Sequence, residues 1–80
     1  MRARVFVMPK KEVLDPQGKA VARSLHALGF SEVASVRVGK LIELELATTN
    51  REQARERTEE MCRKLLANGV IEDFSLEIED

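Results

Sequence analysis

The order in which the hydrophobic spacing changes along the chain is the feature that most restricts its fold. Apolar residues recur every second residue in a first segment, every third or fourth in the next, and every second over a long third segment. A second segment with the spacing of three to four follows, and a last segment alternates every second residue again. A spacing of two is typical of a half-buried strand, and a spacing of three to four is typical of an amphipathic helix. The pattern therefore predicts strand, helix, strand, strand, helix, strand.

The first strand and the first helix have well-defined limits in the sequence. Residues 3–8 alternate between small apolar side chains on one face and a mixed set on the other. Asp15 and Pro16 are expected to begin the helix, because an Asp side chain caps the first turn and proline fits the first helical position. Gly29 suits the left-handed residue that often follows a helix end. The buried stripe of this helix would consist of Val21, Leu25 and Leu28.

The long third segment, residues 33–47, alternates throughout and has Gly39 and Lys40 in its middle. Glycine in the first position of a two-residue turn favours a β-hairpin. The alternative is one long strand with a bulge at Gly39. We predict the hairpin, because a strand of about 15 residues is rare.

The second half of the chain repeats the order of the first. Residues 49–52 form a capping-box pattern that predicts a helix start, and Asn68 with Gly69 predicts its end. Residues 74–79 alternate again as a last strand. Right-handed crossovers then favour two interleaved β-α-β halves. We predict the α+β class: a two-layer sandwich of β-α-β-β-α-β order, a ferredoxin-like plait or close variant with both helices on one face of an antiparallel sheet, and residues 1–80 as one domain.

The sheet face that both helices leave bare combines charge with a small apolar group. If the first strand lies between the third and the fourth, Arg2 and Arg4 face glutamates on both neighbours, and such cross-strand pairs stabilise a sheet modestly. Phe6, Met8 and Leu41 form an apolar cluster among these charges. Because an apolar patch with a charged rim indicates a protein interface, we predict self-association through it, as a homodimer or higher oligomer; the alternative is simple exposure. The facing glutamates are Glu43, Glu45, Glu77 and Glu79.

The residue types that carry catalysis and metal binding are sparse. Cys62 is the one cysteine and His26 the one histidine, so the chain has no CxxC pair and no internal disulfide. Phosphate-loop and dinucleotide motifs are absent, and the expected open face has only one aromatic side chain, Phe6 amid glutamates, where an RNA-binding sheet needs several. The net charge of -1 gives no bulk attraction to nucleic acid or membrane. We expect no catalytic, cofactor or metal residue, no nucleic-acid or membrane partner, and a reducing, cytoplasmic location.

Three segments of the chain carry a more specific pattern. They are VLDPQG at residues 13–18, preceded by Pro9-Lys10; VRVGKLIE at 36–43; and CRKLLAN at 62–68, which continues as VIED at 70–73. Together they resemble the small subunit (PurS) of phosphoribosylformylglycinamidine synthase, over nearly the whole chain. The pattern departs from that family at Gly69, where proline is expected, but glycine also suits a helix end.

The resemblance implies a non-catalytic subunit of the purine pathway. Such subunits are expected to be dimers that join a large ATP-using synthase subunit to a glutaminase subunit. In that complex ATP, Mg²⁺ and ammonia from glutamine would convert formylglycinamide ribonucleotide to the amidine. No cofactor would belong to this chain. The residues that we predict to contact the partner subunits are Lys10, Asp15, Arg37 and Lys40, with Asp15 also a candidate for a simple helix cap.

Two other functions remain as alternatives. A regulatory plait that binds a small ligand, such as an amino acid, at a dimer interface would favour a glycine-rich loop after the first strand. The loop at residues 9–14 contains no glycine, which counts against that function. A free-standing enzyme is disfavoured, because no catalytic grouping is present.

Overall fold

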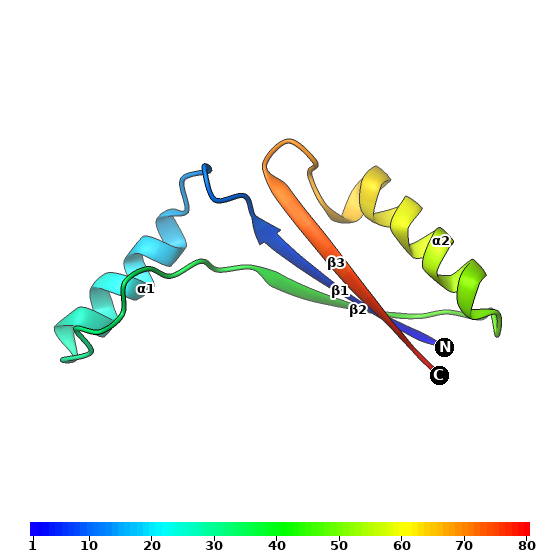
Figure 1. The fold of residues 1–80 in the computed structure, drawn as a ribbon, viewed down its shortest axis with the longest axis horizontal. Helices are drawn as coiled ribbons and strands as arrows, with labels where there is room; N and C mark the ends of the chain where they lie inside the picture. Colours follow the sequence, from blue (N-terminus) through cyan, green and yellow to red (C-terminus); the bar gives the residue numbers. More distant parts are fainter.

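β1 lies at the centre of a three-stranded antiparallel sheet of order β2-β1-β3 (Figure 1). The computed structural model describes all 80 residues of the chain. Both neighbours pair with β1 in one register, in which Val5 lies opposite Ile42 on β2 and Leu76 on β3. The elements are β1 (Arg2–Pro9), α1 (Pro16–Ala27), β2 (Lys40–Glu45), α2 (Arg51–Met61), the π-helical turn η1 (Cys62–Leu66) and β3 (Glu72–Glu79).

The core lies between the inner face of the sheet and α2. Ala3, Val5 and Val7 of β1 are buried, as the alternation of residues 3–8 predicts. α2 packs on β3 and β1 and buries Ala54 and Thr58 against them. The helix begins one residue later than the capping box of residues 49–52 predicts: the cap is Asn50 and not Thr49, and the Asn50 side chain accepts a hydrogen bond from the backbone N–H of Gln53. These elements form one layer of helix on one layer of sheet.

α1 lies beyond the end of the sheet and makes no extended contact with any strand or with α2 (Figure 1). It begins at the predicted cap, Asp15, and is followed by Gly29 with a φ of 98°, as predicted. The displaced helix makes the chain long and thin: it measures 48 × 26 × 14 Å and has a radius of gyration of 15.9 Å. A compact domain of this length has a radius of gyration of about 12 Å.

The α+β class, the antiparallel sheet, the two helices and the central position of β1 are confirmed. The predicted hairpin is wrong. Residues 33–38 form no strand, and the chain runs through Gly39 into β2 without reversing (Figure 1). The single chain therefore has three strands in place of four, and α1 does not share a sheet face with α2.

The hairpin fails for two physical reasons. A two-residue turn that begins with glycine needs a positive φ there, and Gly39 does not have one. The turn would also place Val38 opposite Leu41 and Val36 opposite Glu43. Because directly opposed residues share a face, the valines would then lie among glutamates, away from the apolar inner face.

Candidate functional site: the arm root and the open sheet face

Residues 10–39, which we call the arm, leave the sheet after β1 and return to it at β2. Because Val7 pairs with Lys40, both connections lie at the same end of the sheet (Figure 1). We call the contacts made there by Lys10, Asp15 and Arg37 the arm root. The root brings together the residues that were predicted to contact partner subunits.

Asp15 links the outgoing segment of the arm to the segment that returns to the sheet. One carboxylate oxygen, Oδ1, accepts from the backbone N–H of Gly18 at 3.0 Å and caps α1. The other, Oδ2, accepts from the backbone N–H of Val38 at 2.8 Å, just before the chain enters β2. The bonds from Val38 and Gly18 stabilise the charged carboxylate and so hold the pKa of Asp15 below its ordinary value. The helix-cap interpretation of Asp15 is confirmed.

Arg37 and Lys10 attach the arm to the sheet. The Arg37 Nη1 donates to the carbonyl of Pro9 at 3.2 Å, which ties the returning segment of the arm to the end of β1. The Lys10 Nζ donates to Asp73 Oδ1 at 2.6 Å, and the Lys10 backbone N–H donates to the carbonyl of Ile71. The hydrogen bond to Asp73 raises the pKa of Lys10. Three of the four predicted partner contacts thus also bind groups of their own chain.

Two glycines allow close approach at the root. A Cβ on Gly39 would overlap Met8 Sδ and the carbonyl oxygen of Val7, and a Cβ on Gly18 would overlap the carbonyl oxygen of Val36. Gly39 is therefore required by close packing against β1, while the sequence pattern suggested a turn. Lys40, next to it, is exposed, and its side chain makes no hydrogen bond or ion pair within the chain.

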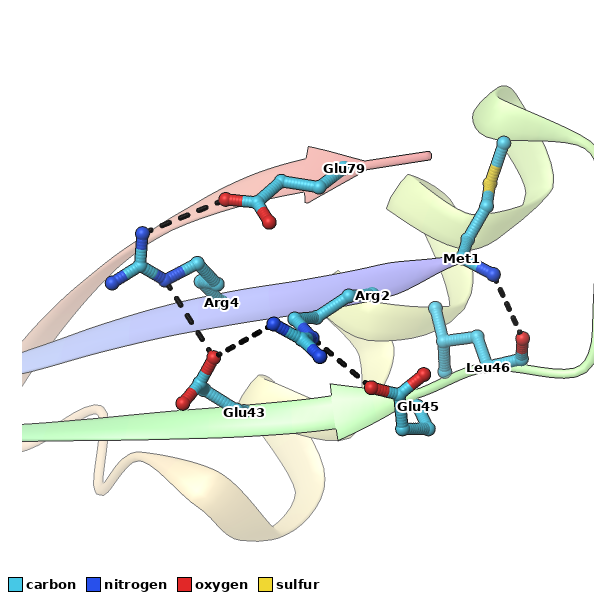
Figure 2. Close-up of polar contacts among 7 residues, drawn as sticks. All are labelled: Met1, Arg2, Arg4, Glu43, Glu45, Leu46 and Glu79. Carbon is cyan, nitrogen blue, oxygen red and sulfur yellow. Dashed lines mark hydrogen bonds and ion pairs between the residues drawn. The ribbon is translucent and has the colours of Figure 1, made fainter.

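The open face of the sheet carries most of the predicted network of cross-strand charges (Figure 2); Glu77 lies opposite Arg4 as predicted but forms no ion pair with it. Arg2 lies between two glutamates of β2, with Nε 3.0 Å from Glu45 Oε1 and Nη1 3.7 Å from Glu43 Oε2. Arg4 bridges both edge strands, 3.9 Å from Glu43 and 3.5 Å from Glu79. The hydrogen bond to Glu45 raises the pKa of Arg2 above its ordinary value. All these groups are partly exposed to solvent, so each pair contributes little to the stability of the fold.

Phe6, Met8 and Leu41 meet on this face, as the alternation predicted. Phe6 lies directly opposite Leu41, and Met8 follows two residues along β1. The Arg4 guanidinium lies 5.8 Å from the centroid of the Phe6 ring, which completes a charged border on one side. Leu41 is 44% exposed. The three residues form a small apolar surface patch, and its role in self-association stays a prediction.

A groove of about 530 Å³ runs between α1 and residues 34–37 and is open to solvent. Its apolar lining comes from residues such as Val13 and Val36. Its charged lining is mainly basic, and it includes Lys19 and Arg23, which sequence reasoning did not single out. Their spacing of four on one helix face was the available signal. The basic lining residues are Lys11, Lys19, Arg23 and Arg37.

Cysteine and histidine are common catalytic residue types, and the chain has one of each. Cys62 is fully buried, and burial raises the pKa of its thiol. His26 Nε2 lies 2.7 Å from the carbonyl oxygen of Val33 and links α1 to the returning segment of the arm. No three His, Cys, Asp or Glu side chains converge as a metal site would require. Neither α1 nor α2 has the length and apolar character that crossing a bilayer requires.

Comparison with known sequences gives one consistent family. The family model described as PurS, phosphoribosylformylglycinamidine (FGAM) synthase, matches residues 2–80. The PurS subunit of phosphoribosylformylglycinamidine synthase from Bacillus subtilis is 46% identical over 79 residues, which cover 99% of this chain and 93% of the relative. The corresponding subunit from Methanocaldococcus jannaschii is 42% identical over 78 residues, which cover 98% and 94%.

Comparison with solved structures agrees. The B. subtilis PurS structure matches with a TM-score of 0.85 at 46% identity and covers 99% of this chain and 98% of its own. A chain in the structure of PurLQS from Thermotoga maritima matches with a TM-score of 0.85 at 32% identity, over 95% of this chain and 93% of that one. The extended placement of α1 thus occurs in a fold that solved structures share along nearly their whole length.

Proposed function

This chain belongs to the PurS family of subunits of phosphoribosylformylglycinamidine synthase, in purine biosynthesis, and we propose that it bridges the synthase and glutaminase subunits of that complex. The observation that carries the proposal is the match to a chain within PurLQS, at 32% identity over nearly the full length. The chain itself offers no grouped catalytic side chains, and its long, thin form suits contact with more than one partner.

The chemistry gives a bridge a definite purpose. The synthase subunit would use ATP and Mg²⁺ to activate the formylglycinamide oxygen as an iminophosphate, which ammonia released from glutamine then displaces. Ammonia that reached bulk water would be diluted and protonated. A subunit that aligns the two active sites keeps its effective concentration high, as tethering does for any pair of reactants. None of these ligands is assigned to residues of this chain.

The surfaces available for the bridge follow from the geometry. Lys40 is exposed and unpaired beside the arm root, so its charge is free for an anionic group on a partner subunit. Lys10, Asp15 and Arg37 would act there mainly by holding the root in shape. The patch of Phe6, Met8 and Leu41 would serve self-association. The assembly would work in the cytoplasm, with ATP and glutamine.

Reconstitution with the synthase and glutaminase subunits tests the bridge. Glutamine-dependent turnover is expected to require this chain, while turnover with added ammonium is expected to depend on it much less. Full glutamine-dependent activity in its absence would rule out the bridging role. Stabilisation of the isolated chain by a free amino acid would instead favour the regulatory plait.

A matched pair of variants tests the predicted contact. Lys40→Glu is expected to raise the concentration of this chain needed for half-maximal glutamine-dependent activity by about tenfold, as loss of one charged contact of roughly 1.4 kcal/mol would. Arg55→Glu makes the same charge change at an exposed, unpaired site on α2 and should have little effect. Equal behaviour of the two variants would remove Lys40 from the contact.

A further inference from the structure

We propose that the outer side of α2 and η1 is a docking surface for an amphipathic helix of another subunit of the complex, with Leu65 as its apolar anchor. The surface is a groove lined by Arg57, Glu60, Met61, Lys64 and Leu65, which we call the α2 groove. The proposal rests on the bridging role proposed above, and it names the surface and the kind of partner for one end of the bridge.

The π-helical turn η1 decides which leucine faces the core. In an uninterrupted α-helix, Leu65 would lie about 20° around the axis from both Ala54 and Thr58, in the centre of the buried stripe. The chain instead makes one wider turn, closed by a backbone hydrogen bond across five residues. Leu66 then packs against the core, and Leu65 is 83% exposed. Single π-helical turns are rare and frequent at functional sites, which indicates a use for the exposed leucine.

Leu65 belongs to one of two rows of side chains that border the α2 groove. The first row, at a spacing of four residues, is Arg57, Met61 and Leu65, and the second is Glu60 and Lys64. The groove between them measures about 270 Å³ and is open to solvent. Rows of side chains four residues apart are the ridges that interdigitate when two helices pack. The α2 groove therefore has the form that receives a ridge of a second helix.

The side chains of the groove define the chemistry of that helix. Met61 is half-buried and Leu65 exposed, so they offer an apolar floor, and methionine adapts its shape to a partner. The Glu60 carboxylate is shared, 2.9 Å from Arg57 Nη1 and 3.3 Å from Lys64 Nζ. One carboxylate against two cations leaves the rim with a net positive charge. A helix that carries an apolar side chain beside an Asp or Glu complements this surface.

The α2 groove lies apart from the patch of Phe6, Met8 and Leu41. α2 packs its inner side on β3 and β1, and no other element of the chain lies on the side away from the sheet (Figure 1). The patch is on the opposite face of that sheet. Two surfaces on opposite sides of the body allow contact with two partners at once, as a bridge requires.

A second copy of this chain is a less suitable occupant of the α2 groove. Two copies that met there about a two-fold axis would each present the same surface. Their net positive rims would then face each other, and like charges disfavour such a pair. The exposed leucine and the basic rim together fit a helix of a different chain with the opposite charge.

Two substitutions of Leu65 test the anchor in the complex reconstituted with the synthase and glutaminase subunits. Leu65→Lys is expected to raise the concentration of this chain needed for half-maximal glutamine-dependent activity about tenfold, as loss of one buried leucine from an interface would. Leu65→Met keeps an apolar side chain of similar size and should stay close to the parent. Because Leu65 is exposed in the isolated chain, neither change should alter its urea unfolding. Equal activity of Leu65→Lys and the parent would overturn the proposal.

A second pair of variants tests the carboxylate expected on the partner helix. Lys64→Glu reverses a charge on the rim and should raise the same half-maximal concentration several-fold. Arg55→Glu makes the same change on α2 outside the groove and should have little effect. Equal behaviour of the two variants would contradict a partner that places a carboxylate at this rim.

Sedimentation of the chain with each subunit in turn separates this proposal from the bridging role. If the parent binds a subunit and Leu65→Lys does not, the groove is supported even where glutamine-dependent turnover proves independent of this chain. Equal binding of the two would overturn the groove and leave the bridge standing, whereas a parent that binds neither subunit would overturn both. A lower mass of isolated Leu65→Lys than of the isolated parent would assign the groove to a second copy and overturn the proposal.

Discussion

The body of the molecule, formed by the sheet and α2, differs sharply from the arm. In the body the arginines of β1 are paired with glutamates, and Val5 and Val7 are fully buried. In the arm most basic side chains have no carboxylate within 4.0 Å, and Leu14 and Leu28 are more than 70% exposed. The comparison shows that the sheet and α2 bury a core and pair the arginines of β1, whereas the arm buries no large side chain; exposed apolar side chains are not confined to the arm, because Leu65 and Val70 are exposed as well.

Substitutions in the body are expected to lower the free energy of unfolding the most. Val5→Ala should lower the free energy of unfolding by about 2–4 kcal/mol, because it leaves a cavity in the fully packed core. Leu28→Ala deletes a larger side chain but should cost less than about 0.5 kcal/mol in dilute solution, where it is exposed. Urea unfolding followed by circular dichroism checks both. Equal costs at low protein concentration would contradict the division into body and arm.

The arm root should show the next largest effect. Gly39→Ala should cost about 1–3 kcal/mol, because the new Cβ overlaps the backbone of β1 and Met8 must move. Gly69→Ala is the control: nothing lies within 4 Å of its added Cβ and its φ is not positive, so the change should be neutral or slightly stabilising. Thermal unfolding of the two variants, side by side, gives the difference.

Acid sensitivity should distinguish Asp15 from an ordinary surface carboxylate. Its pKa is lowered in the folded chain, so its contribution to stability is present above its ordinary pKa of 3.8 and is lost as pH falls through the folded value. Asp15→Asn keeps an oxygen for the helix cap but loses the charge that Val38 and Gly18 stabilise. The variant should be less stable than the parent at pH 7 and approach it below pH 3.8. A difference that is independent of pH would assign the effect to shape alone.

The smallest effect is expected on the open face. Glu79→Gln should cost less than about 1 kcal/mol, because the pair with Arg4 is 3.5 Å long and partly exposed. Salt should reduce the difference between parent and variant further, as exposed charges are screened. Unfolding at 0.05 M and 1 M sodium chloride measures it, and a cost that salt leaves unchanged would point to packing by Glu79 in place of charge.

Local chemistry predicted much of the body. Alternation in β1 correctly identified Ala3, Val5 and Val7 as core, and the pairing of Arg2 and Arg4 with glutamates followed from the expected position of β1. The start of α1 was also predictable, because a cap depends on residues three positions apart.

The arm could not be predicted in the same way. The bond between Asp15 and Val38 spans 23 residues, and neither residue type indicates the other. Gly39 has the same sequence signature for a turn and for close packing, and only the position of β1 distinguishes them.

The amino-acid sequence by itself determined both helices, three of the four predicted strands, the apolar faces of these elements and the family of the chain, because these depend on neighbouring residues and their spacing. Only the tertiary structure decided that residues 33–38 stay unpaired and that α1 stands away from the sheet. The reason is physical: alternation specifies that a strand forms and which side it buries, but it does not specify which chain supplies the neighbouring strand.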